Sequence, residues 1–357
     1  MKKTPSRQNK SWPRLLLDVL TGTHVLFYLL PYMMVLLIAG TVAQKYVGLF
    51  TATHLFFSSF ILWVGPVPLP GGASALTLLF VNLAAYFIVK SQWTETAIGS
   101  TLAHLGVIVL LLGGLVTLID KQEGFIILRH GQPAEAFYDY HTRLFTIVKN
   151  GKEIRQIDAD TLADGQTLRF DDIPFPIGIE KIYANSTIDD RNNLKALPAR
   201  KEEETNQLGL AFTVEKNGKP QRFVVAEFLQ QQPVFKSGDG VFRFTLKRAS
   251  EKLPFSLRLN ELIQDTYPGS DMAKAYETRF TVREKDHQWP AHVAMNDPLR
   301  YKGYTFYQAS VLTLPNGEQA SVFNAVKDAG WLFPYAATAL VSVGLLINAW
   351  MKRHAKK

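Results

Sequence analysis

Residues 98–119 read IGSTLAHLGVIVLLLGGLVTLI and contain no charged side chain. A helix of this length can cross a bilayer, which requires about 20 predominantly apolar residues. Three further stretches have a similar character, at 23–43, 74–90 and 331–351. The sequence therefore predicts a membrane protein with four transmembrane α-helices. We expect the first of these to remain as an anchor, because its apolar run exceeds the ~7–15 residues of a signal-peptide core.

Basic residues are concentrated at particular ends of the predicted spans. They precede the first span, follow the second and follow the fourth, as Lys2, Lys3, Arg7, Lys10, Arg14, Lys90, Lys352, Arg353, Lys356 and Lys357. Lys45 is the one basic residue between the first two spans. Since Lys and Arg favour the cytoplasmic side, we expect cytoplasmic tails at 1–22 and 352–357 and a cytoplasmic loop at 91–97. Residues 44–73 and 120–330 should then lie outside.

The composition excludes several classes of function. The formal net charge is +8, but much of it lies in the two tails, where it serves topology and contact with anionic lipid rather than nucleic acid. The chain contains no cysteine. It can therefore hold no disulfide, no thiolate-bound metal and no covalently attached c-type haem of its own.

The segment 44–73 joins the first two spans and is rich in aromatic residues. Phe50, Phe56, Phe57, Phe60 and Trp63 resemble the aromatic belt of a membrane–water boundary. We expect a short interfacial helix here, ended by the Pro- and Gly-rich stretch GPVPLPGG at 65–72.

Residues 120–330 have a different pattern, with short runs rich in Val, Ile, Phe and Thr between turn dipeptides. Asn150-Gly151 and Asn217-Gly218 are typical of type I′ hairpin turns, in which both central residues need positive φ. The pattern predicts a large, mainly antiparallel, extracytoplasmic β domain. Within it, the charged stretch 189–206 is expected to be a mobile loop.

His104 is the residue in the spans most suggestive of chemistry, because an ionisable group inside a membrane helix is a candidate for function. One interpretation is an axial ligand to haem iron, which takes a neutral imidazole nitrogen. The alternative is a hydrogen bond to a neighbouring helix. Gly99, Ala103, Gly106 and Gly113 form a small-residue stripe beside it, suited to close approach of another helix or of a flat ligand.

The other histidines point less clearly to a site. His54, in the expected interfacial helix, is a candidate second haem ligand or an interfacial histidine bound to water. His24 begins the first span, where snorkelling explains it. The β-domain histidines lack zinc-site spacing and are expected on a solvated surface: His130, His141, His287 and His292. No nucleophile elbow or phosphate-binding glycine loop is present, so this domain is interpreted as a binding or structural module.

Three segments carry a resemblance to a known family. They are GTVAQ at 40–44, PFSLRLNELIQDTYPG at 254–269 and NDPLRYKGYTFYQAS at 296–310. In the last, Asp297-Pro298 predicts a turn and Tyr304 and Phe306 should share one face of a strand, opposite Thr305 and Tyr307. Its motif residues are Asn296, Pro298, Arg300, Tyr301, Gly303, Tyr304, Phe306 and Gln308. With His104 in the third of four spans, the chain resembles the ResB family of cytochrome c biogenesis proteins (System II) over nearly its whole length.

The resemblance implies a function and partners. Such proteins reside in the bacterial inner membrane and pair with a ResC- or CcsA-type membrane protein that carries a tryptophan-rich haem-handling motif. The resemblance implies that the pair exports haem b and attaches it to apocytochrome c. In fused versions, a histidine in the corresponding span is one of two intramembrane haem ligands, and it matches His104.

This chain lacks the tryptophan-rich motif, so the resemblance implies a non-catalytic subunit of a cytochrome c haem lyase rather than an enzyme by itself. It also has Ala43 where many family members have proline. Two alternatives stay open. One is a membrane scaffold or chaperone whose β domain binds a partner protein, and the other is a sensor or transport accessory protein.

Overall fold

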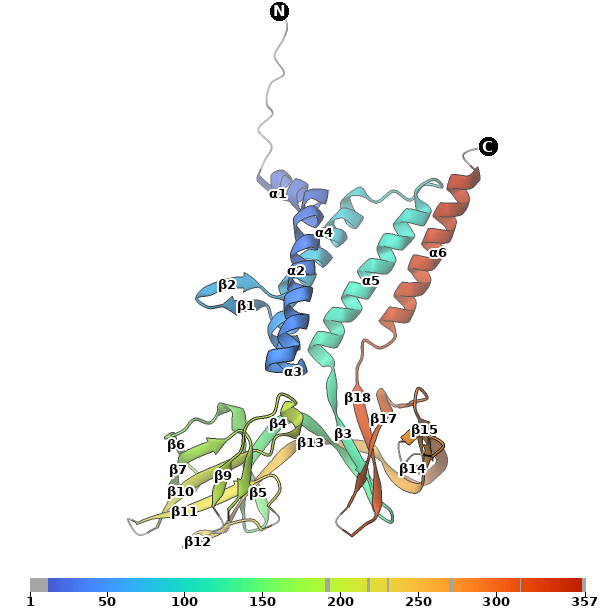
Figure 1. Ribbon diagram of the computed structural model, residues 1–357. Helices are drawn as coiled ribbons and strands as arrows, with labels where there is room; N and C mark the ends of the chain where they lie inside the picture. The colour runs from blue at the N-terminus through green and yellow to red at the C-terminus, as the bar shows by residue number, and fades with distance from the viewer. Residues whose placement is uncertain are drawn as a thin grey trace, which may run out of the picture. The chain divides into compact units, whose positions relative to one another are not determined.

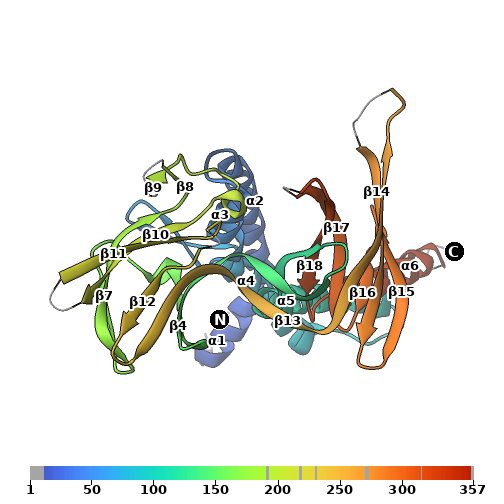
Figure 2. The same ribbon diagram turned by 90° about the horizontal axis from the view of Figure 1, so that it is seen from below.

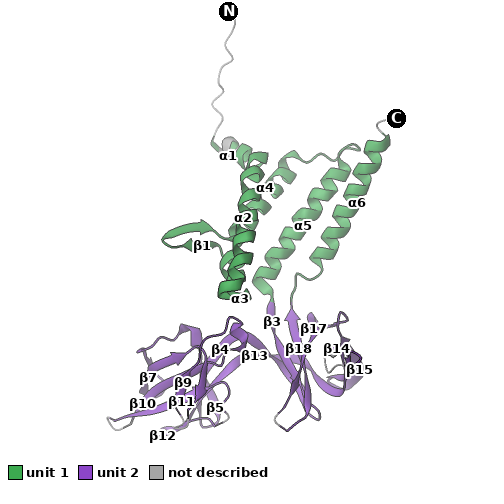
Figure 3. Cartoon of the chain, viewed as in Figure 1, with its two compact units in different colours: residues 1–121, 328–357 green, residues 122–327 purple. Residues whose placement is uncertain are grey.

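The computed structural model describes residues 12–189, 193–216, 219–229, 231–269, 273–314 and 316–354 (Figure 1). The chain divides into two compact units (Figure 3). The helical unit comprises Met1–Lys121 and Asp328–Lys357, and the β unit comprises Gln122–Lys327.

The described part of the helical unit contains four helices long and apolar enough to cross a membrane, which confirms the predicted number. They are α2 Thr23–Val47, α4 Gly72–Lys90, α5 Ile98–Asp120 and α6 Phe333–His354. Helix α2 runs beyond the predicted span and ends at Gly48, whose φ of 86° only glycine adopts readily. Helix α6 continues to His354, into the stretch expected as a tail.

The predicted tail 1–22 is partly helical, which its charge pattern did not indicate. Helix α1 spans Trp12–Leu20, whereas Lys2, Lys3, Arg7 and Lys10 lie outside the described residues, as do Lys356 and Lys357. Asn82 of α4 donates hydrogen bonds to the carbonyls of Leu20, at 2.5 Å, and Gly22, at 3.2 Å. The α1–α2 connection thus satisfies the one amide side chain in the middle of α4.

The segment 44–73 holds more structure than a single interfacial helix. Helix α3 Leu49–Ala52 continues into a π-helix, η1 Thr53–Ser58, and then into a hairpin of β1 Ile61–Val64 and β2 Val67–Pro70. The Pro/Gly pattern ends the helix but gave no sign of the hairpin. Its turn uses Gly65 at φ 60°, which suits the first central position of a type II′ turn.

The β unit contains a large antiparallel β domain, as predicted. Its main sheet has ten strands, with the path β15-β14-β13-β4-β3-β18-β17-β16 and with β12 on β13 and β5 on β4. Figure 1 labels β3 and β5, and Figure 2 shows β4 and β12 to β18 from below. The bounds are β3 Gln122–Leu128, β4 Pro133–Lys149, β5 Lys152–Asp158, β12 Val234–Ser237, β13 Gly240–Thr266, β14 Ala273–Glu284, β15 His287–Ala294, β16 Leu299–Tyr301, β17 Tyr304–Thr313 and β18 Gln319–Lys327. A second sheet has the order β11-β10-β7-β6, from β6 Thr167–Phe170, β7 Ile173–Tyr183, β10 Gly209–Lys216 and β11 Lys219–Ala226.

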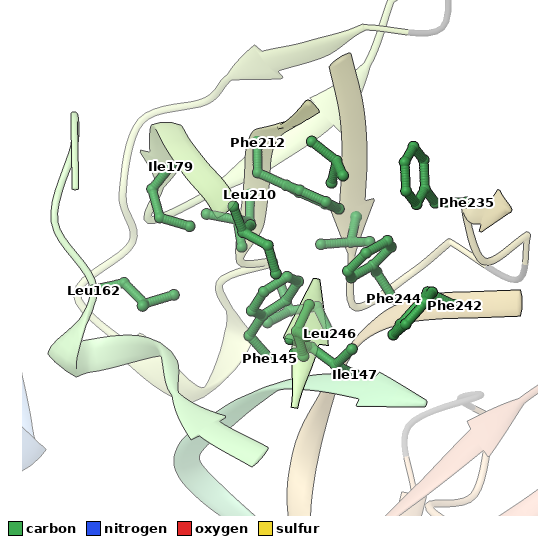
Figure 4. Close-up of a cluster of buried hydrophobic side chains, with 14 of the residues drawn as sticks. Phe145, Ile147, Leu162, Ile179, Leu210, Phe212, Phe235, Phe242, Phe244 and Leu246 are labelled. Atoms are coloured by element: carbon green, nitrogen blue, oxygen red, sulfur yellow. The ribbon is translucent and has the colours of Figure 1, made fainter. Parts of the chain in front are cut away.

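Two hydrophobic cores lie along the long strands β4 and β13. The first gathers alternating apolar residues of these strands and of the four-stranded sheet (Figure 4). Phe145 and Phe212 meet edge to face at 5.2 Å between ring centroids, a favoured aromatic geometry. The second core lies under β3, β13, β14, β17 and β18, where Leu257, Phe280 and Phe323 are fully buried. Each core removes several large side chains from water, which is the main driving force for folding.

The predicted turns have mixed outcomes. Asn150 and Gly151 both have positive φ, 51° and 83°, as a type I′ turn requires. Asn217-Gly218 lies outside the described residues, although Lys216 and Lys219 on either side are paired. The stretch 189–206 is more ordered than expected: β9 Leu194–Ala196 pairs with β8 Ser186–Ile188, and Glu203–Thr205 form a 3-10 turn. Residues 190–192 of that stretch lie outside the described residues.

Candidate functional site

His104 lies on α5 beside α4, at a small cavity of about 230 Å³. The Tyr86 ring of α4 lies 6.1 Å from the imidazole, centroid to centroid, and is tilted by 39° to it. Lys90, the last residue of α4, lines the same cavity together with Ser100 and Thr101 of α5. The imidazole itself is exposed on the surface of this chain.

The hydrogen bonding of His104 selects one tautomer. Nδ1 lies 2.8 Å from the carbonyl oxygen of Ser100, one helical turn earlier. A carbonyl can only accept, so Nδ1 carries the hydrogen and donates it. The lone pair of the neutral ring then resides on Nε2, which is the arrangement that a metal-binding histidine needs.

The small-residue stripe of α5 is occupied by a helix. A Cβ atom added to Gly99 would lie 2.7 Å from the carbonyl oxygen of Gly344 in α6, and one added to Gly106 would lie 2.9 Å from that of Ala337. The stripe could accommodate either another helix or a flat ligand, and in the structure it packs against a helix, α6. His104 flanks this packed face and stays available toward α4 and the surroundings.

The residues at this cavity match part of what a haem site requires. A neutral imidazole with an available Nε2 is a normal axial ligand for haem iron, and Lys90 supplies a cation that could meet a propionate. The volume of about 230 Å³ is below the ~300–1,000 Å³ of pockets that enclose cofactor-sized ligands. The described residues thus offer an axial ligand without an enclosing pocket.

The other histidines described in the helical unit, His24, His54 and His354, do not line this cavity. His54 is exposed in η1 and stacks on Phe50 at 5.9 Å with nearly parallel rings. Among the described residues, no hydrogen bond or ring contact joins His54 to His104. His24 is exposed at the first turn of α2. No group of three or more potential metal ligands occurs in the described part of the chain.

Two of the family-like segments have structural explanations. Gly40 of the GTVAQ segment is buried on α2, where an added Cβ would lie 2.5 Å from the ring of Phe57 in η1. In the NDPLRYKGYTFYQAS segment, Leu299–Tyr301 and Tyr304–Thr313 form the hairpin β16–β17. Lys302 and Gly303 have φ values of 50° and 81°, so they form a type I′ turn.

The strand after this turn alternates as predicted. Tyr304 and Phe306 are buried, whereas Tyr307 is exposed. The Tyr304 hydroxyl lies 3.2 Å from a carboxylate oxygen of Glu251, which also accepts from Lys327 at 2.9 Å. Burial is the main cause that raises the Tyr304 pKa, and the Glu251 charge adds to it.

Other motif residues take part in polar contacts of the same region. The Gln308 side-chain oxygen accepts from the buried Thr278 hydroxyl at 2.7 Å, and its amide donates to the buried Ser321 at 3.0 Å.

A second polar group surrounds Glu284, to which the Tyr301 hydroxyl donates at 2.5 Å. The pKa of Glu284 is lowered, chiefly by the hydrogen bond from Lys302 and also by the one from Tyr301. Asn296, at φ 65°, precedes the Asp297-Pro298 turn, and Arg300 lies exposed on β16. These residues shape the second core, and the described contacts do not unite them into a catalytic site.

The sequence did not indicate the most prominent buried charges, a group formed by Arg143, Glu227 and Arg248. Nε of Arg143 and Nε of Arg248 lie 3.0 and 2.9 Å from the two carboxylate oxygens of Glu227. All three side chains are at most 13% exposed. The glutamate is 84 residues from the first arginine, so no local pattern could reveal the contact.

The prediction that every β-domain histidine lies on a solvated surface is wrong for His141. It is half-buried next to Arg143, and burial, as the main cause, lowers its pKa. Burial also raises the pKa of the neighbouring Tyr140 to about 12, with a further contribution from Glu123. His130, His287 and His292 are exposed, as expected.

Comparison with known proteins places the chain in a family. No curated protein matches it. Among solved structures, it is similar to the cytochrome c haem lyase CcmF at 11% identity and a TM-score of 0.25, over 97% of this chain and 36% of that chain. This similarity is too weak to support an argument. The model of the ResB-like family matches residues 90–330, which include α5 with His104, the β unit and the NDPLRYKGYTFYQAS segment. The chain therefore belongs to the ResB-like family of cytochrome c biogenesis proteins.

Proposed function

We propose that this protein is a haem-handling membrane subunit of cytochrome c biogenesis, in which His104 supplies one axial ligand to haem b in transit. The observation that carries the proposal is the contact between Nδ1 of His104 and the Ser100 carbonyl. Its Nδ1–H is held by the Ser100 carbonyl at 2.8 Å, and Nε2 is presented on an exposed helix face within the family-matched region. Haem is the cargo here, and attachment to the client apocytochrome c takes place elsewhere in the complex.

The residues of this chain would bind and orient the cargo. His104 would hold the iron, while Lys90 would pair with a propionate at the edge of the same cavity. Since the cavity is too small to enclose haem, a ResC- or CcsA-type partner must supply the opposite face and the second axial ligand. The chain would thus be a non-catalytic part of a haem lyase rather than a synthase by itself.

The charge distribution supports an orientation in the bacterial inner membrane. Lys90 ends α4, and Lys352 and Arg353 lie in the last turn of α6. With these ends cytoplasmic, both chain ends face the cytoplasm and the β unit is extracytoplasmic. His104, in the second turn of α5, then lies in the cytoplasmic half of the span, where haem would enter.

A non-haem scaffold is the second candidate. The observation in its favour is that the Ser100 contact also satisfies Nδ1 of His104 without any ligand, and that the described motif residues Tyr304, Phe306 and Gln308 pack within the β unit. In that case the β unit would chaperone a partner protein.

The absorption spectrum of the detergent-purified protein, co-expressed with its ResC- or CcsA-type partner, tests the proposal. The native chain and His104→Ala should be compared at equal amounts of folded complex. We expect a Soret band in the native complex that is lost or shifted in His104→Ala, because the iron loses an axial ligand. His287→Ala, which removes an exposed histidine of the β unit, should leave the band unchanged.

Two results would count against haem ligation by His104. An equal and unshifted Soret band in the variant would remove this residue from the mechanism. A complex that assembles with its partner but holds no haem in either form would favour the scaffold. His54→Ala measured alongside tests whether the second histidine contributes.

A further inference from the structure

The outer face of β13 and β14 carries a row of basic side chains. Lys252 and Arg258 lie on β13, Arg283 lies on β14, and Lys285 lies in the turn that follows β14. All four are exposed. Among the described residues, none of the four forms an ion pair. These side chains line a cleft of about 480 Å³, to which Glu135 contributes one carboxylate. We call it the β13–β14 cleft.

The positive charge of this cleft is a local feature. Residues 122–327 contain 27 basic and 27 acidic residues, so the β unit is neutral by sequence. Elsewhere on the unit, basic residues form ion pairs, for example Arg155 with Asp172 and Lys247 with Glu153. A neutral domain is not the electrostatic footprint of a nucleic-acid-binding protein, which is basic overall.

An irregularity in strand pairing opens the cleft. Lys252 pairs with Ala136 and Leu257 pairs with Ala134, so four residues of β13 stand opposite the single residue Glu135 of β4. Such bulges bend a strand and re-aim its side chains, and they are common next to functional sites. The bulge is Leu253–Ser256, which includes the start of the family-like segment at 254–269.

The cations are spread along a strand rather than gathered at a point. Buried Leu253, Phe255 and Leu257 alternate with outward-facing residues, so Lys252 and Arg258 share the outer face. At about 3.3 Å per residue, they are separated by up to roughly 20 Å along the strand. A single phosphate or lipid headgroup would meet one or two of these charges. An extended chain with carboxylates on alternate residues would meet all of them.

We propose that the β13–β14 cleft binds an extended acidic peptide segment of a partner protein. Lys252, Arg258, Arg283 and Lys285 would pair with its carboxylates. The segment would lie beside the bulge, where Leu253–Ser256 have no partner on the described part of β4. The carboxylate of Glu135 repels an acidic ligand, so removal of this charge should strengthen binding. This site is independent of haem ligation by His104.

The test is peptide binding to the full chain in nanodiscs of neutral lipid, followed by fluorescence anisotropy. The probe is a fluorescein-labelled peptide of five Glu-Thr repeats, and a peptide of five Gln-Thr repeats is the uncharged control. Replacing the four cleft cations together by Gln should weaken binding of the Glu-Thr peptide about tenfold or more, because each exposed ion pair contributes a modest amount. Glu135→Gln should tighten it about twofold, and added salt should weaken it.

A control variant with the same change in charge distinguishes the cleft from general attraction. It replaces four exposed basic residues elsewhere on the β unit by Gln: Arg169, Lys195, Lys219 and Lys236. We expect less than a twofold change in it. Equal weakening in both variants, or unchanged binding in the cleft variant, would overturn the proposal. The proposal would also be overturned if the cleft cations were needed for binding to phosphatidylglycerol vesicles and the Glu-Thr peptide did not bind. The haem spectrum of the cleft variant should stay native, so failure here is separable from failure of the proposed function.

Discussion

At the scale of single residues, His104 and Glu227 satisfy their polar atoms in opposite ways. His104 satisfies one ring nitrogen within its own helix and leaves the other available. Glu227 is fully engaged, since each of its carboxylate oxygens accepts from an arginine. Backbone carbonyls accept further hydrogens of the two guanidinium groups, for example those of Tyr140 and Glu204. The available ring nitrogen of His104 is suited to binding a ligand. The paired carboxylate of Glu227 is suited to holding the β unit in one packing arrangement.

The buried Arg143–Glu227–Arg248 group leads to a prediction about stability. Glu227→Gln leaves Arg143 and Arg248 without a counter-charge in a buried place, which typically costs about 3–5 kcal/mol. In a unit of this size we expect the unfolding temperature to fall by about 10 °C. Circular dichroism of the detergent-solubilised chain, followed at a β-sheet wavelength, measures this shift.

Asp172→Asn is the matched control for that variant. It breaks the Arg155–Asp172 pair, which has the same 2.9 Å separation but is 43% exposed on both sides. Solvent screens exposed pairs, so the change should be below about 1 kcal/mol. Equal shifts for Glu227→Gln and Asp172→Asn would show that burial does not govern these pairs.

At the scale of elements, α5 and α6 approach each other through glycines. A Cβ added to Gly99 would lie 2.6 Å from the backbone nitrogen of Asn348, and one added to Gly344 would lie 2.6 Å from that of Ala103. Backbone atoms cannot move aside as a flexible side chain can. The two glycines are therefore required by the close approach of the helices, as in other small-residue interfaces of membrane proteins.

Alanine substitutions in α5 test this packing. Gly99→Ala should force the helices apart and destabilise the helical unit by about 1–3 kcal/mol, the usual cost of overpacking. Gly114→Ala is the control on the same helix, because nothing lies within 4 Å of an added Cβ. Thermal unfolding in detergent, followed at 222 nm, should show a lower midpoint for the first variant and no loss for the second. A lower midpoint for Gly114→Ala alone would contradict this packing.

At the scale of the whole molecule, charge and apolarity are segregated between the two units. The β unit is neutral, so the entire formal charge of +8 belongs to residues 1–121 and 328–357. The same residues contain all four candidate spans of the described chain. Such a division suits a membrane anchor that carries a water-exposed domain.

The proposed orientation can be tested because the chain contains no cysteine. Glu95→Cys places a single thiol in the 91–97 loop, and Asp239→Cys places one in the exposed β12–β13 turn. In intact spheroplasts, a membrane-impermeant maleimide should label Asp239→Cys. It should label Glu95→Cys after lysis only. The reverse pattern would place the β unit in the cytoplasm and contradict the positive-inside argument.

The position of His104 within the third span could be predicted from the sequence, but its hydrogen bond and its packing surroundings could not. His104 is conspicuous because a histidine within an apolar run of 22 residues has no solvent to hydrate it. Which face of α5 it occupies relative to α6, and which tautomer it takes, depend on contacts with Ser100 and on packing through Gly99 and Gly344. The small-residue stripe alone was compatible with either a helix or a flat ligand.

The sequence by itself determined the features that follow from local patterns. Four apolar runs specify four helices, period-two runs specify the β unit, and Asn150-Gly151 specifies a turn with positive φ, because each depends on neighbouring residues alone. Tertiary structure decided the Arg143–Glu227–Arg248 group, the β13–β14 cleft and the β1–β2 hairpin. The first two depend on residues many positions apart whose pairing only the folded chain brings about, and the hairpin depends on a glycine conformation that its Pro/Gly composition left open.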